Sequence, residues 1–162
     1  MAKQLTRWIE EEVREEQVRI ARQRELALAG EVVASREDDT VKELILELRK
    51  QAAEYSTSFE RVHVAVSDDQ KSLGESYHRV SVFGGCPAAR STYTDVKHSH
   101  GTGRITCSTL EGKTFYFEIG CDDTGRIVIG SSLRGEALEV EHVAEDILKP
   151  MVSYVRRGSV SV

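Results

Sequence analysis

The sequence of 162 residues is poor in the residue types that mark several specialised classes of protein. It contains 2 prolines, 3 cysteines and 1 tryptophan, and aromatic residues make up 6% of the chain. So little proline excludes collagen-like and proline-rich architectures. An odd, sparse set of cysteines is not the disulfide framework of a small secreted protein. The scarcity of aromatic residues argues against a stacking platform for nucleic-acid bases.

Long hydrophobic runs are also missing. No stretch approaches the ~20 consecutive apolar residues of a transmembrane helix, and the N-terminal residues have no apolar core of a secretion signal. We therefore expect a cytoplasmic protein with no membrane partner. The formal net charge of -5 opposes general attraction to nucleic acid, so we do not expect a nucleic-acid partner either.

The overall composition and the distribution of residue types along the chain indicate a globular α+β protein. Hydrophobic residues make up 40% and charged residues 30% of the chain, which is the balance of a folded domain. The sequence changes character near residue 60, where dense charge and helix formers give way to β-branched residues and glycine-bearing turns. We interpret residues 1–59 as a helical extension or oligomerisation region, and residues 60–162 as an antiparallel sheet domain with a C-terminal helix.

Two helices are predicted in the extension. The first covers residues 3–34. The polar run 35–39 is interpreted as a break, because Thr40 followed by Glu43 matches a capping box that starts a second helix over 41–57. We expect the two helices to form a coiled coil or a helical hairpin.

The second predicted helix carries an apolar seam with steps of four and three residues, the spacing of a heptad repeat. This spacing favours packing against another helix, so we interpret the seam as an interface between copies of the chain. Its alternative is an amphipathic helix lying on its own sheet. The predicted interface consists of Val41, Leu44, Ile45, Leu48, Ala52 and Tyr55.

Beyond residue 60 the hydrophobic period becomes two, which is typical of strands. Short turns between successive runs favour an antiparallel meander of about six strands. The polar run 91–98 is interpreted as an edge strand, and Phe117 is expected on the inward face. The predicted strands cover residues 61–66, 75–83, 91–98, 104–109, 114–119 and 126–129.

A C-terminal helix is predicted to pack on the sheet, because Val143, Ala144 and Ile147 form part of one apolar face. Pro150 is expected to kink or end this helix, since proline lacks the N–H that the helix needs. A second short helix would then follow. A sheet curved around a helix is a common way to cover one apolar face.

The segment from Lys97 to Arg104 is the strongest candidate for chemistry. His98 and His100 share a face if the predicted strand 91–98 continues through residue 100. With Cys86 as a third ligand, this placement predicts a metal site formed by His98, His100 and Cys86. The same segment also predicts an anion site beside glycine amides, formed by Lys97, His98, His100 and Arg104. The alternative to both sites is a polar turn with two exposed histidines.

No catalytic constellation or cofactor motif is present, so we lean against an enzyme and expect no cofactor. The leading hypothesis is a non-enzymatic homo-oligomeric adaptor, in which the helices mediate self-association or docking and the β domain binds a protein partner. The alternative is a domain that binds a small ligand, an anion or a metal, or hydrolyses a substrate, through the His98/His100 loop. Its pocket would lie between the sheet and the C-terminal helix and contain His78, His98 and His100.

Overall fold

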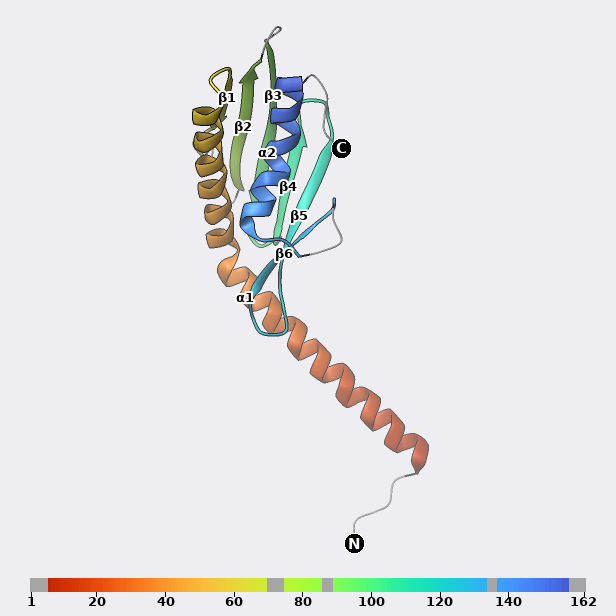
Figure 1. Ribbon diagram of the computed structural model, residues 1–162. Helices are drawn as coiled ribbons and strands as arrows, with labels where there is room; N and C mark the ends of the chain where they lie inside the picture. Colours follow the sequence, from red (N-terminus) through yellow and green to blue (C-terminus); the bar gives the residue numbers. More distant parts are fainter. Residues whose placement is uncertain (1–5, 70–74, 86–88, 134–136, 158–162) are drawn as a thin grey trace.

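The computed structural model describes residues 6–69, 75–85, 89–133 and 137–157. Along the chain, one helix precedes six strands and a second helix follows them (Figure 1). The elements are α1 (Arg7–Ser58), β1 (Val62–Val66), β2 (Glu75–Gly84), β3 (Arg90–Ser99), β4 (Arg104–Thr109), β5 (Thr114–Cys121), β6 (Ile127–Ser131) and α2 (Val140–Arg157).

The strands form one antiparallel sheet in which each strand pairs with its neighbour in sequence. The predicted α+β class and the six-stranded meander are confirmed. The interpretation of residues 91–98 as an edge is wrong, because β3 pairs with both β2 and β4. Asp95 and Lys97 lie on the outer face of β3, whereas Thr94, Val96 and His98 point inward and are buried.

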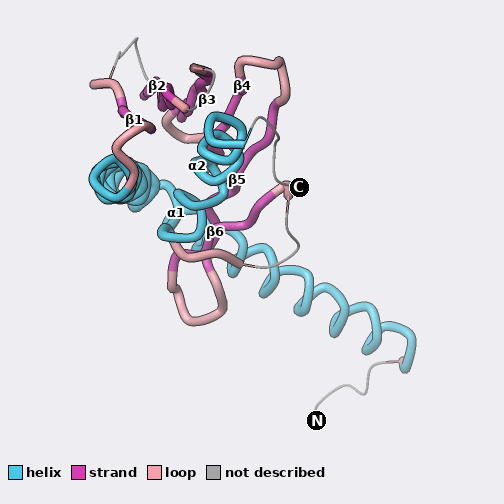
Figure 2. Tube along the Cα trace, turned by 45° about the horizontal axis from the view of Figure 1, so that its top comes forward, coloured by secondary structure: helices cyan, strands magenta, loops and turns pink. Residues whose placement is uncertain are grey.

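The sheet curls around α2, and the C-terminal half of α1 lies beside it (Figure 2). Both helices contact β1 and each other, so buried residues from the sheet and the two helices form one hydrophobic core. The predicted packing of the C-terminal helix on the sheet is confirmed. Pro150 does not end this helix, because α2 continues from Val140 to Arg157. Met151 and Val155, which follow the proline, keep facing the core.

Residues 7–58 form a single helix, which corrects the prediction of two. Among the described residues, neither a helical hairpin nor a coiled coil is present. The hydroxyl of Thr40 donates to the carbonyl oxygen of Arg36 at 2.9 Å, a bond within the helix that replaces the predicted cap. Residues 35–39 contain no proline or glycine, so their polarity alone does not break the helix.

The heptad seam packs on the sheet of its own chain. Leu44 and Leu48 have no exposed surface, and Tyr55 packs partly buried against the same core. These side chains are not available to a second copy, so the assignment of the seam as an interface is corrected in favour of its alternative. The residues concerned are Val41, Leu44, Ile45, Leu48, Ala52 and Tyr55.

The N-terminal half of α1 extends away from the rest of the molecule (Figure 1). We call residues 7–31 the arm. Within it, only Ile9 and Ala29 are partly covered, and all other residues are exposed. The arm is therefore a helix without tertiary packing in the described chain. It leaves the body near Val33, which packs against the core.

Candidate functional site

A buried carboxylate joins α1 to the turn between β3 and β4. The side chain of Glu37 is 1% exposed and accepts hydrogen bonds from the backbone N–H groups of Gly101 and Gly103, the latter at 2.8 Å. Both glycines have positive φ angles, of 88° and 62°, which L side chains rarely adopt. This turn conformation directs two amides at one carboxylate.

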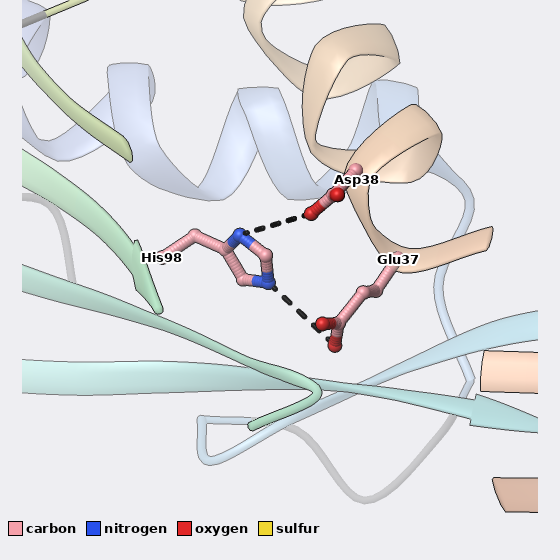
Figure 3. A group of neighbouring side chains, drawn as sticks. All are labelled: Glu37, Asp38 and His98. Atoms are coloured by element: carbon pink, nitrogen blue, oxygen red, sulfur yellow. Dashed lines mark ion pairs between the residues drawn. The ribbon is translucent and has the colours of Figure 1, made fainter. Parts of the chain in front are cut away.

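His98 reaches the same carboxylate from the inward face of β3 (Figure 3). The residue is 4% exposed. Its Nε2 atom lies 3.6 Å from Oε2 of Glu37 and has no hydrogen-bond partner in the described chain. Its Nδ1 atom lies 4.0 Å from Oδ1 of Asp38. The expectation of an exposed histidine is therefore wrong at this position, because strand alternation places residue 98 inside.

His100 completes the cluster from the turn after β3. Its side chain is 61% exposed, and its Nδ1 atom lies 3.1 Å from a carboxylate oxygen of Asp38 and 3.4 Å from Oε1 of Glu37. The hydrogen bond to Asp38 raises the pKa of His100. The structure thus brings the two predicted histidines to one pair of carboxylates.

Sequence reasoning missed both acids, because it placed them in a break between helices. One signal was present: Glu37 lies four residues before Val41, in step with the buried seam. Had the helix been extended through the polar run, this spacing would have predicted an inward-facing carboxylate. The partners of Glu37 are more than 60 residues away in sequence, and no local pattern identifies them.

The remaining predicted site residues lie elsewhere. Lys97 points to the opposite face of β3, where its ammonium group lies 5.3 Å from the centre of the Tyr77 ring. Arg104 pairs with Glu118 at 2.7 Å. The four groups of the predicted anion site are therefore not brought together, and carboxylates face its two histidines. Cys86, the third predicted metal ligand, lies outside the described residues.

A groove of about 660 Å³ opens beside the cluster, between α1 and strands β2 and β3. It is lined by apolar residues of α1, including Val41 and Ile45, and by His78, His98 and His100. Nδ1 of His78 donates to the carbonyl oxygen of Ser67 at 3.0 Å, which leaves Nε2 toward Asp69. The three histidines predicted to line a pocket between the sheet and the C-terminal helix line this groove against α1.

The arm is a second surface with unusual features. Its exposed large apolar side chains are Trp8, Val13, Val18, Ile20, Leu26 and Leu28. Its charges are separated along the helix. Residues 10–16 hold five glutamates and one arginine, and residues 17–24 hold three arginines and no acid. We call these two segments the acidic block and the basic block.

Together these features define an α+β protein with a curled meander, a histidine–carboxylate cluster and a projecting helical arm. Comparisons with family models, with curated proteins and with solved structures find no match for this chain. Of the helices described, none combines the length and apolar character needed to cross a membrane.

Proposed function

We propose that the protein is a non-enzymatic homodimeric adaptor, in which the arms of two copies pair in antiparallel orientation and each sheet domain is free to bind a protein partner. The observation that carries this proposal is the arm itself: 25 helical residues that lack tertiary packing and expose six large apolar side chains. Most helical stability in proteins comes from packing an apolar face, and the arm has no such packing among the described residues.

A second copy would cover this apolar surface. Four apolar residues of the arm are spaced at steps of 4, 7 and 7, which keeps side chains on one side of paired helices. They are Ile9, Val13, Ile20 and Ala27. Complete burial of one Val, Leu or Ile side chain contributes about 1.5–3 kcal/mol. A few such contacts from each arm are enough to offset the cost of association at micromolar concentration.

Charge favours the antiparallel orientation. If the arms cross at residue 18, the acidic block of one copy lies opposite residues 20–26 of the other, which include Arg22, Arg24 and a single acid, Glu25. The same crossing places Ile9 opposite residue 27. In a parallel, in-register pair, five glutamates would face five glutamates, and like charges on neighbouring helices are repulsive.

This arrangement determines what the dimer presents. Because the body begins about 15 residues beyond the crossing point, at a rise of about 1.5 Å per residue, the two sheet domains would lie about 45 Å apart along the paired arms. The exposed outer faces of both sheets remain uncovered. Such a dimer can hold two partner molecules at a set distance.

Size-exclusion chromatography with light scattering tests the proposal on the full chain. We expect twice the chain mass of 18.1 kDa at tens of micromolar. The variant Glu12→Lys/Glu16→Lys and the variant Arg22→Glu/Arg24→Glu should each be monomeric, and their mixture should form a heterodimer. A monomeric native chain would refute the proposal.

Two controls make the result specific. Glu111→Lys/Asp123→Lys changes the net charge by the same amount as the acidic-block variant but acts at exposed turns of the sheet, so this variant should remain dimeric. A mixture of the native chain with Glu12→Lys/Glu16→Lys distinguishes the orientations. Antiparallel pairing predicts a heterodimer weaker than the native homodimer, because the introduced lysines would face the native basic block at one of the two contacts, whereas parallel pairing predicts a heterodimer stronger than the native homodimer.

A further inference from the structure

We propose that Glu37, Asp38, His98 and His100 bind one divalent transition-metal ion where the arm leaves the body. The first reason is the Nε2 atom of His98, which is buried without a hydrogen-bond partner. Buried polar atoms are nearly always paired, so an orphaned one requires an explanation. In neutral imidazole this nitrogen can present a lone pair, and the carboxylate oxygen Oε2 of Glu37 lies 3.6 Å from it. A cation between the two atoms would satisfy both.

The spacing of the ligand atoms fits a small ion. Zinc binds imidazole nitrogen at about 2.0–2.1 Å and carboxylate oxygen at about 2.0–2.2 Å, so neighbouring ligands of a tetrahedral ion are about 3.4 Å apart. Nε2 of His98 lies 3.6 Å from Oε2 of Glu37. Nδ1 of His100 lies 3.4 Å from the other oxygen of Glu37, Oε1, and 3.1 Å from Oδ2 of Asp38. One ligand atom from each of Glu37, Asp38 and His98 lies within 4.8 Å of the others.

The second shell is also in place. The amides of Gly101 and Gly103 hold the carboxylate of Glu37, and each of its oxygens keeps a further lone pair for a metal. Ligating carboxylates in proteins are commonly oriented in this way by outer hydrogen bonds. The turn between β3 and β4 therefore fixes the one ligand that comes from the buried face of α1.

The donor set selects the class of metal. Two imidazoles and two carboxylates suit zinc and related first-row ions, whereas magnesium and calcium prefer oxygen ligands alone. Two carboxylates also balance the charge of a divalent ion when both histidines are neutral. An ion at this position would bridge α1 and the turn between β3 and β4, and so tie the base of the arm to the sheet.

Isothermal titration of the metal-free full chain with zinc chloride tests this site. We expect one zinc per chain and no binding of magnesium. His100→Ala and Asp38→Asn, which alter exposed side chains, should keep the melting temperature of the metal-free protein and weaken zinc binding about tenfold or more. The matched control His142→Ala removes an exposed histidine on α2 and should bind zinc like the native chain.

Free thiols also bind zinc, so the titration is repeated on Cys86→Ser/Cys121→Ser. We expect unchanged affinity in this variant. Zinc binding that disappears with the thiols but survives both His100→Ala and Asp38→Asn would overturn the proposal. Absence of binding to the native chain at millimolar zinc would overturn it as well. Neither result affects the proposed dimer, because its contacts lie on the arm.

Discussion

At the scale of residues, burial separates two histidines that are neighbours in sequence. His98 lies among buried side chains of β3, whereas His100 extends into solvent and contacts Asp38. The sequence alone predicts equal and negligible effects of replacing either one. The structure predicts unequal effects, because only one of the two side chains fills space inside the protein.

We therefore expect His98→Ala to lower the free energy of unfolding by about 1–3 kcal/mol, the range typical of substitutions that leave a cavity. His100→Ala should change it by no more than about 0.5 kcal/mol. Urea denaturation of the metal-free proteins measures both values. Equal losses for the two variants would mean that the surroundings of His98 are not as the structure places them.

Asp95 provides a pH-dependent contribution on the outer face of the sheet. Burial acts to raise the pKa of this carboxyl group, but hydrogen bonds from Arg79, at 2.8 and 3.2 Å, and from Tyr77 outweigh it and lower the pKa below its ordinary value. A carboxylate with a lowered pKa in the folded state stabilises the protein above its unfolded-state pKa. That stabilisation is lost as the pH falls through the folded-state pKa.

The expected consequence is a pH-dependent effect of Asp95→Asn. At pH 7 the variant should melt below the native chain, and the difference should shrink as the pH falls below about 4. Differential scanning calorimetry across this range measures the difference. Asp123→Asn, at an exposed turn, serves as the control and should show no such trend. A constant difference from pH 7 to pH 3 would contradict the assignment.

At the scale of elements, β5 shows how alternation divides a strand between core and solvent. Phe117 has no exposed surface and packs edge-on against Phe115, with ring centres 5.8 Å apart. Tyr116 points outward, where the guanidinium group of Arg104 lies 4.2 Å from the centre of its ring. The concave face thus carries the core, and the convex face carries polar and aromatic pairs.

Phe117→Ala should cost about 3–5 kcal/mol of stability, the usual effect of truncating a buried phenylalanine. Tyr116→Ala should cost much less, since its ring loses an exposed contact and leaves no cavity. Chemical denaturation of both variants gives the comparison. If the two losses were equal, the outer face of β5 would have to be covered as fully as the inner one.

At the scale of the whole molecule, one helix has two roles that meet near Glu37. Its C-terminal half supplies Leu44 and Leu48 to the core, and its N-terminal half is the exposed arm. The division of the chain after residue 59 therefore does not separate two structural units. Helix and strands share a single hydrophobic core across that boundary.

A pair of matched substitutions distinguishes the two halves of α1. Leu48→Asp places an unpartnered carboxylate in the core and should cost at least about 3 kcal/mol, without creating a stable folded monomer. Val13→Asp should leave the melting transition of the sheet unchanged and weaken the proposed dimer. Light scattering and thermal unfolding of the same samples measure both effects. A folded, monomeric Leu48→Asp variant would contradict this assignment.

The elements of the sheet follow directly from the sequence. Alternation of apolar and polar side chains predicts every strand, and the glycine-bearing turns predict their antiparallel order, because both signals depend on residues adjacent in the chain. The apolar stripe of α2 is likewise predicted by residues that are close together in the sequence. These predictions needed no knowledge of distant contacts, and the structure confirms them.

Errors arose where a local signal competed with a tertiary one. Thr40 and Glu43 have the spacing of a capping box, but a helix can run through them when its polar residues find partners elsewhere. Glu37 finds such partners in the turn between β3 and β4. The heptad seam was equally ambiguous, since a helix buries the same stripe against its own sheet or against a second chain.

The sequence by itself therefore determined the class, the strand order and the inward face of β5. Only the tertiary structure decided that α1 is continuous, that its seam is internal, and that His98 and His100 meet Glu37 and Asp38. The reason is physical: backbone periodicity is fixed by neighbouring residues. The pairing of a buried carboxylate with a turn more than 60 residues away depends on how the sheet curls and brings the two together.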